Sequence, residues 1–268
     1  MMSGHNVIGA AIVIGACILA PWASGARAEL ICDFEQPTYT TTGGSDGAGA
    51  LDGQGGWFLY NGEHPKVSTE NPLNGSQSLK LASDGKVAHD LGEDFGDEVT
   101  LKIALSRDST DAAGTYGGLF VYLGTEGVDQ ADFSKTAAQF GLGLDTGVVT
   151  YRDGGSYVSV APFAASQWYT FEASIHFDDT DPNGGSYDLK ITSTDPNWTD
   201  FIATGIQFRG GSAAVGAEDI LINRFQSGAL SDWIDDLTIA STVVPEPSTV
   251  ILLAGMICFL WMRHHRDR

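Results

Sequence analysis

The chain has 268 residues, with 34 acidic and 14 basic side chains and a formal net charge of −20. A surface with this charge repels nucleic acid and anionic lipid, so neither is expected as a partner. Two of the three cysteines, Cys17 and Cys258, lie in apolar terminal segments, which leaves Cys32 alone between them. With a single cysteine, the region between these segments cannot form an internal disulfide, so its hydrophobic core or a metal ion must stabilise it.

Residues 1–28 have the pattern of a secretory signal peptide. An apolar stretch, Val7–Ala20, precedes the small-x-small triplet Ala26-Arg27-Ala28, which predicts cleavage after Ala28. The mature chain would then begin at Glu29. Two alternatives stay open, a membrane helix over Val7–Ala20 and a lipoprotein attachment site at Cys17.

Residues 29–243 are predicted to form one all-β domain. Short alternating or β-branched stretches recur between turn residues, and 34 glycines punctuate the chain. In 99–105 and 168–177 every second residue is apolar, which indicates strands with one buried face. Hairpin turns are expected at 153–156 and 179–185. This pattern predicts an antiparallel β-sandwich.

Three short stretches in this domain suggest a more specific fold. They are Ile31–Glu35 near its start, Gly75–Leu81, and Trp233–Ile239 near its end. Together they resemble jelly-roll domains of the concanavalin-like and carbohydrate-binding-module type. In such domains a structural calcium ion often ties the opening strand to the closing one, and hard oxygen ligands suit Ca²⁺.

Carried over to this chain, the resemblance implies calcium ligands at Asp33, Glu35, Asp235 and Asp236. If Phe34 points inward, Asp33 and Glu35 point outward together. The alternative is that these carboxylates only solubilise strand ends at a sheet edge.

A second calcium candidate lies in the turn at 179–184. Asp179, Asp181 and Asn183 match the first half of a D-x-D-x-N-G calcium loop. The twelfth position is Lys190, where an EF-hand needs glutamate, so this is not an EF-hand. Asparagine- and aspartate-rich turns give the same pattern without a metal.

Three aromatic residues are candidates for carbohydrate binding. Tyr151 and Tyr157 flank the turn at 153–156 and are expected on the same side of the hairpin. Trp198 lies in the polar loop 195–200, where a ring is expected to be exposed. The alternative for each of the three rings is packing in the core or against a loop.

The C-terminal segment 244–268 has three parts in order. Pro245-Glu246-Pro247 is followed by an apolar run, Val250–Met262, and then by an end with three arginines. The prolines favour extended backbone, so a helix would begin after them. The apolar run spans only about 20 Å at ~1.5 Å per residue, less than the ~30 Å hydrocarbon core of a membrane. We expect a marginal anchor with its basic end in the cytoplasm, the alternative being a buried C-terminal helix.

These three parts resemble the PEP-CTERM sorting signal of exported proteins in Gram-negative bacteria that make exopolysaccharide. The resemblance implies recognition by an exosortase and removal of the apolar end near Pro245-Glu246-Pro247. The protein would be held at the inner membrane for a time, and then reach the cell surface or the extracellular matrix.

The sequence therefore predicts an exported surface or matrix protein that associates with polysaccharide. One alternative is a polysaccharide-active enzyme, a glycosidase or lyase, on the same fold. The E-x-D-x-E pattern usual in concanavalin-like glycosidases is absent from the sequence, and no catalytic residue is assigned. The other alternative is a purely structural matrix protein without a ligand.

Overall fold

The computed structural model describes residues 29–241 apart from 45–46, 82–84, 93–94, 109–117, 126–132, 144–146, 212–213, 215 and 226–230. The predicted cleavage site at Ala26 and Ala28, the sorting motif Pro245-Glu246-Pro247 and the apolar segment behind it lie outside the described residues. Within the described part, no helix is long and apolar enough to span a membrane. Residues Arg27–Val244 form one compact unit.

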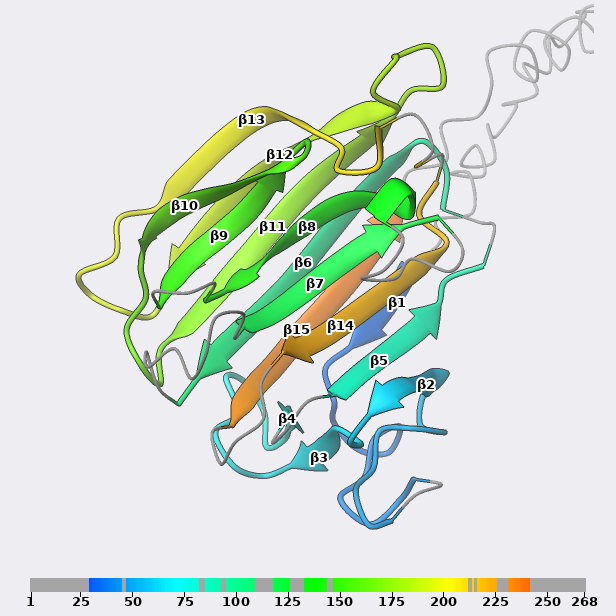
Figure 1. Ribbon diagram of the computed structural model, residues 1–268. Coiled ribbons are helices and arrows are strands. Elements are labelled where there is room, and N and C mark those ends of the chain that lie inside the picture. Colours follow the sequence, from blue (N-terminus) through cyan, green and yellow to red (C-terminus); the bar gives the residue numbers. More distant parts are fainter. Residues whose placement is uncertain are drawn as a thin grey trace, which may run out of the picture. The chain divides into compact units, whose positions relative to one another are not determined.

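The described residues form two antiparallel sheets (Figure 1). Sheet A has the strand order β13 (Phe201–Gln207), β12 (Gly185–Ser193), β11 (Trp168–Phe177), β6 (Glu98–Arg107), β15 (Asp232–Ser241), β4 (Ser78–Leu81) and β3 (Lys66–Ser68), and β1 (Glu29–Cys32) also pairs with β15. Sheet B has the order β10 (Ser156–Pro162), β9 (Val148–Asp153), β8 (Thr136–Leu142), β7 (Gly118–Gly124), β14 (Asp219–Phe225), β5 (Gly85–Asp90) and β2 (Trp57–Gly62).

The only helix in the described part is a short 3₁₀ turn, η1 (Phe133–Lys135). The predicted all-β, antiparallel sandwich is therefore confirmed. The predicted hairpins at 153–156 and 179–185 are confirmed as well, since they join β9 to β10 and β11 to β12.

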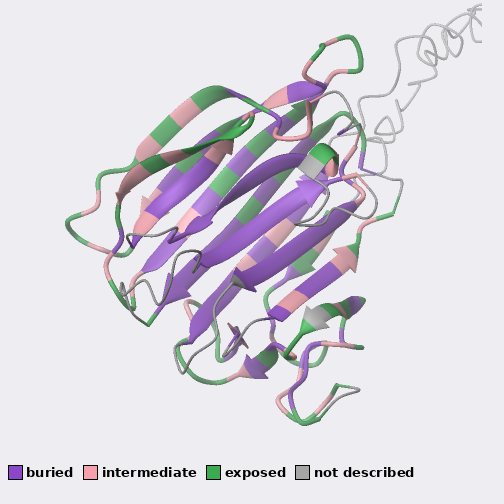
Figure 2. Ribbon diagram, viewed as in Figure 1, coloured by how far each residue is buried: buried purple, intermediate pink, exposed green. Residues whose placement is uncertain are grey.

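Alternation along the strands of sheet A explains its two faces. In β11, Phe171, Ala173, Ile175 and Phe177 are buried, while the residues between them are partly or fully exposed. Figure 2 shows the same alternation in the first half of β6, residues 98–102, whereas its second half is buried throughout. The inward side chains of both sheets form one core, where the rings of Phe140 and Phe171 stack with centroids 5.1 Å apart. Each large apolar side chain buried there contributes about 1.5–3 kcal/mol.

The central strands of sheet B are buried on both faces. Every residue of β7, and every residue of β8, is buried, as Figure 2 shows. On the outward face, Phe120 and Tyr122 of β7 pack with Leu221 of β14 and Ala88 of β5 in a second, smaller apolar cluster. Sheet A has an outward cluster of its own, Ala104, Trp168 and Trp233, but elsewhere the outward residues of β11 are exposed.

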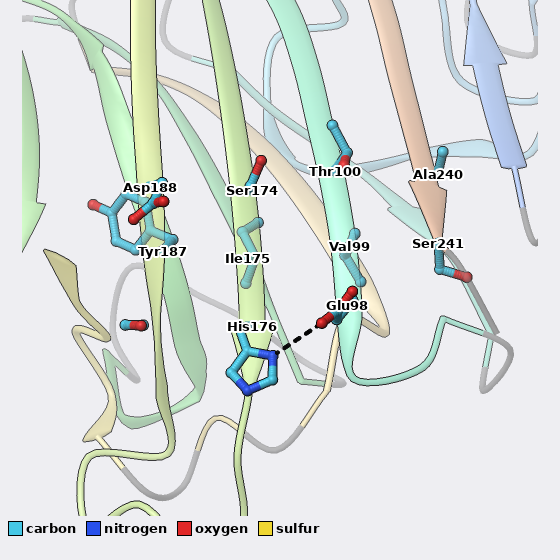
Figure 3. A pocket seen from close by; sticks show the side chains of 11 residues that line it. Glu98, Val99, Thr100, Ser174, Ile175, His176, Tyr187, Asp188, Ala240 and Ser241 are labelled. Carbon is cyan, nitrogen blue, oxygen red and sulfur yellow. Dashed lines mark ion pairs between the residues drawn. The ribbon is translucent and has the colours of Figure 1, made fainter. Parts of the chain in front are cut away.

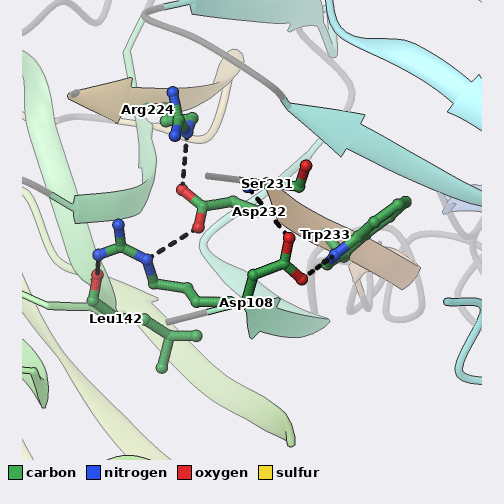
Figure 4. Close-up of polar contacts among 7 residues, drawn as sticks. Asp108, Leu142, Arg224, Ser231, Asp232 and Trp233 are labelled. Carbon is green, nitrogen blue, oxygen red and sulfur yellow. Dashed lines mark hydrogen bonds and ion pairs between the residues drawn. The ribbon is translucent and has the colours of Figure 1, made fainter. Parts of the chain in front are cut away.

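A buried charge cluster links the two sheets (Figure 4). Asp232 of β15 accepts a 2.8 Å hydrogen bond from Nε of Arg107 on β6 and a 2.9 Å bond from Nε of Arg224 on β14. All three side chains are at most 5% exposed. Nearby, Asp108 accepts hydrogen bonds from the amide of Ser231 and the indole of Trp233. The triad fixes the end of sheet A against sheet B.

Candidate functional site

A group of cationic, aromatic and amide side chains lies on the outward face of sheet B. We call it the sheet B cluster, and it comprises Tyr122 (β7), Gln139 (β8), Arg152 (β9), Tyr157 (β10) and Arg209, which follows β13. Strand pairing brings its members together, because Tyr122 lies opposite Gln139 and Arg152 lies opposite Tyr157.

The outward direction of the four strand residues follows from the pleat. Their neighbours along the strands lie in the core or pack against it, namely Val121, Phe140, Tyr151 and Val158. Successive side chains of a strand point to opposite faces, so the cluster faces away from the core. Gln139 and Tyr122 are buried, whereas Arg152 and Arg209 are half-buried and Tyr157 is exposed.

Hydrogen bonds and a stacking contact connect the cluster. The Gln139 amide donates a 3.2 Å bond to the Tyr157 hydroxyl, and its carbonyl accepts a bond from Arg209. Arg209 also bonds to the Tyr122 side chain. The Arg152 guanidinium lies 3.5 Å from the centre of the Tyr157 ring, a cation–π contact. The buried amide and the ring therefore hold the two guanidiniums in fixed positions.

The two positive charges of the cluster lie in a partly desolvated place. Burial lowers the pKa of Arg209 to about 10, and the positive charge of Arg152 acts in the same direction. Arg209 is still protonated at neutral pH. The Nε atom of Arg152 is buried and has no hydrogen-bond partner among the described residues. Arg152 and Arg209 are both partly exposed, so the cluster can present positive charge to an anion from solution.

Two of the three predicted aromatic residues are not open ring platforms. Tyr151 is only 8% exposed, and its ring packs against Phe201 with centroids 5.9 Å apart. The ring of Trp198 packs edge-on against Tyr169, and its indole N–H bonds to the Ile191 carbonyl. One side of Trp198 also borders a surface hollow of about 500 Å³.

The prediction that Tyr151 and Tyr157 share a side of the hairpin was wrong. Asp153 pairs with Ser156 across the turn, so Tyr151 lies opposite Val158 and points into the core. Tyr157 points outward and is 37% exposed, but Arg152 covers one face of its ring. Residues that pair directly across the turn share a face, so Tyr157 shares its face with Arg152 and not with Tyr151.

Two of the predicted calcium ligands, Glu35 and Asp235, form hydrogen bonds with loop 73–77. Glu35 accepts hydrogen bonds from the amides of Ser76 and Gln77 and from the Ser76 hydroxyl. Partial burial opposes its charge, but these bonds keep the pKa of Glu35 below its usual value. Gly75 lies against this carboxylate with φ +66°, where another residue would be strained, and a Cβ there would be 2.3 Å from Glu35 Oε1, so the carboxylate would have to move.

Asp235 holds the other end of this loop. Its carboxylate accepts bonds from the amides of Leu73, Asn74 and Asp236. Burial raises the pKa of Asp235 to about 6 in spite of these bonds. Asp236, with φ +50°, accepts a bond from the Asn74 side chain. The opening and closing parts of the chain therefore meet at loop 73–77, as the resemblance to jelly-roll domains implies.

The fit of a metal ion to these side chains is limited. Asp33 accepts a bond from the Glu35 amide, and every carboxylate oxygen of Glu35 and Asp235 accepts a bond from the protein. No group of three His, Cys, Asp or Glu side chains placed to hold a metal occurs in the described part of the chain. Calcium at Asp33, Glu35, Asp235 and Asp236 stays a prediction.

The second calcium candidate is a turn stabilised by its own side chains. Asp181 Oδ1 accepts a 2.7 Å bond from the Asn183 amide, and Asp178 accepts bonds from Thr180. Asp179 is exposed. These are the contacts of aspartate-containing turns, which form without a metal.

A hollow of about 350 Å³ lies on the outward face of sheet A (Figure 3). His176 and Glu98 border it, with 3.7 Å between Nδ1 and Oε1. Both side chains are more than half exposed, so this pair contributes little to stability or binding. The sheet B cluster, with its buried amide and fixed guanidiniums, is the better candidate for a site.

The sequence did not point to Arg152, Arg209 or Gln139 as site residues. The chain has only 14 basic residues, so an arginine within the predicted sandwich is a weak indication of a binding site. Arg152 also follows Tyr151 directly, and alternation would have placed it on the other face. Arg209 lies outside a strand, and no local pattern links it to β8.

Comparison with known proteins places the fold. No family model and no curated protein matches the chain. Among solved structures it is similar to a sialidase, with TM-score 0.51 and 15% identity over 81% of this chain and 19% of that one. It is also similar to a mutant of alginate lyase Aly36B in complex with alginate trisaccharide, with TM-score 0.48 and 14% identity over 81% of this chain and 99% of that one. A third is the marine PL-14 alginate lyase from Aplysia kurodai, with TM-score 0.44 and 11% identity over 65% and 86% of the two chains.

The chain thus spans about a fifth of the length of the sialidase. The similarity to that protein shows the β-sandwich that the two share.

Proposed function

We propose that the protein is a surface or extracellular-matrix protein that associates with polysaccharide through the outward face of sheet B. The sheet B cluster carries this proposal. It places two guanidiniums, a phenol and a buried amide together on one face of a protein with a net charge of −20. The fold also suits a carbohydrate role, since a sialidase shares it.

The cluster has the properties of a preformed site. Arg152 rests on the Tyr157 ring, and Gln139 bonds both Tyr157 and Arg209, so ligand binding would order few side chains. Guanidinium groups present several N–H donors in a fixed plane, which suits the closely spaced oxygens of a sugar.

A glycosidase is supported less well by the described residues. That chemistry needs two carboxyl groups about 5–10 Å apart, one with a raised pKa. The pKa of Asp235 is raised, but its oxygens accept the amides of loop 73–77 and of Asp236. The carboxylate is buried in a structural contact, so it is a poor candidate for an acid that protonates a substrate.

The terminal segments supply the rest of the proposal. A signal peptide over residues 1–28 would direct export, and the segment 244–268 would be recognised by an exosortase through Pro245-Glu246-Pro247. The protein would be anchored in the inner membrane for a time before release to the cell surface or matrix. A structural calcium ion at loop 73–77 is a further part of this proposal.

Affinity gel electrophoresis tests the binding role. The purified full-length protein is run in gels containing single polysaccharides, among them the exopolysaccharide of the host. We expect retardation by at least one polymer, and a smaller retardation for Arg152→Ala. Lys190→Ala is the matched control, because Lys190 is an exposed cation on sheet A. Absence of retardation in every gel would leave a structural matrix role.

A further inference from the structure

The sheet B cluster concentrates positive charge on one small area of an acidic protein. Arg152 comes from β9 and Arg209 from the segment after β13, yet the charge of Arg152 lowers the pKa of Arg209. Both side chains are half-buried, so water screens their repulsion incompletely. An anion beside the two guanidiniums would be attracted by both positive charges.

The supporting contacts fix both guanidiniums. The Gln139 side chain is fully buried, and its carbonyl accepts a bond from Arg209. The Tyr187 hydroxyl donates to the backbone carbonyl of Arg152, and the Tyr157 ring supports the guanidinium of that residue. A buried amide that orients a cation toward an outward face is a feature of a built site.

The same contacts disfavour a site that binds neutral sugar by ring stacking. Arg152 already covers one face of the Tyr157 ring, and Phe120 lies near it with centroids 6.1 Å apart. A ligand that approaches this face of Tyr157 therefore meets the Arg152 guanidinium and not the open ring. Planar guanidinium groups bind carboxylate and sulfate oxygens in pairs, with shorter and stronger hydrogen bonds than neutral donors make.

We propose that the sheet B cluster binds the anionic group of an acidic polysaccharide, either the carboxylate of a uronic acid or a sulfate ester. Arg152 and Arg209 contact the anion, while Gln139 and Tyr157 are positioning residues. This inference rests on the proposed function and specifies its ligand class. The net charge of −20 repels a polyanion at long range, as it does nucleic acid, but charges beyond a Debye length of about 8 Å are largely screened at physiological salt. Binding of an acidic polysaccharide therefore depends on the short-range contacts of the two guanidiniums.

Matched pairs of polymers test the charge requirement. The full-length protein is run in gels containing polygalacturonate, its fully methyl-esterified form, dextran sulfate or dextran. Each pair keeps the backbone and removes the anion. We expect retardation by polygalacturonate, by dextran sulfate or by both, and none by the neutral partner. Which acidic polymer retards the protein identifies the anion as carboxylate or sulfate.

Variants test the residues. Arg152→Ala and Arg209→Ala should each weaken the apparent affinity at least about tenfold, whereas Lys190→Ala should leave it unchanged. Arg152→Lys and Arg209→Lys keep the charge and should retain part of the affinity. Near-ultraviolet circular dichroism checks folding, and if Arg209→Ala does not fold, Arg209→Lys replaces it with an expected loss of about threefold.

Equal retardation by charged and neutral partners would overturn the inference and leave the proposed function standing. So would retardation by acidic polymers that both folded arginine variants retain in full. Absence of retardation by these polymers and by the host exopolysaccharide would contradict the proposed function itself.

Discussion

Replacing Asp232 by asparagine removes the negative charge that lies between Arg107 and Arg224. The three side chains are almost completely buried, and the carboxylate bonds both guanidiniums at 2.8 and 2.9 Å. Breaking a buried ion pair by removing one partner typically costs about 3–5 kcal/mol, because the remaining charges stay buried without compensation. That is a large fraction of the roughly 5–15 kcal/mol by which a domain is stable.

Urea unfolding followed by tryptophan fluorescence measures the loss. With a slope of about 2 kcal/mol per molar urea, the midpoint for Asp232→Asn should fall by about 2 M. Asp108→Asn is the control, since Asp108 is exposed, accepts two hydrogen bonds from the described residues, and would keep an acceptor as asparagine. Its loss should stay under about 1 kcal/mol. Equal losses for the two variants would refute the argument that buried charge links the sheets.

Three further predictions concern loop 73–77 and the termini. If calcium binds at Glu35 and Asp235, excess chelator should lower the melting temperature, and an unchanged melt would remove calcium from the account. Because the pKa of Asp235 rises from 3.8 to about 6 on folding, the folded state binds more protons between these pH values, and stability should fall by at most about 3 kcal/mol as pH rises from about 4 to about 6. Urea midpoints of the Asp235→Asn variant should not show this fall with pH. The same fall in the variant and the wild type would mean that Asp235 does not cause it. Replacing Pro245-Glu246-Pro247 by alanines should leave the C-terminal segment uncleaved in the native host, which mass spectrometry of the mature protein checks.

Alternation was enough to predict two central strands of sheet A, β6 and β11, whereas β3 and β13 were not predicted. In residues 99–105 of β6 and throughout β11 every second residue is apolar, and the sequence therefore showed both the strand and its inward face. In β7 the run Gly118–Gly124 is apolar throughout, and such a run indicates a strand without saying what covers its second face. The outward apolar cluster around Phe120 and Tyr122 was accordingly not predicted.

The candidate site could not be predicted because its parts come from distant positions. Gln139 and Arg209 meet across 70 residues, and no local pattern connects a buried amide on β8 with a loop arginine. Asp235 and the amide of Leu73 are 162 residues apart, but here the resemblance to jelly-roll domains placed the opening and closing strands together. Tyr157 was predicted from the sequence as a ring that stacks on sugar. In the structure its ring instead supports the Arg152 guanidinium.

Hydroxyl-radical footprinting with a retarding polysaccharide would test most directly whether the outward face of sheet B is the contact surface. Oxidation of Tyr157 is compared with that of His176, which lies on the outward face of sheet A with 57% of its side chain exposed. The ratio within one sample corrects for radicals consumed by the polymer. We predict that bound polymer lowers oxidation of Tyr157 severalfold and leaves His176 unchanged. Protection of His176 with Tyr157 unchanged would contradict the account.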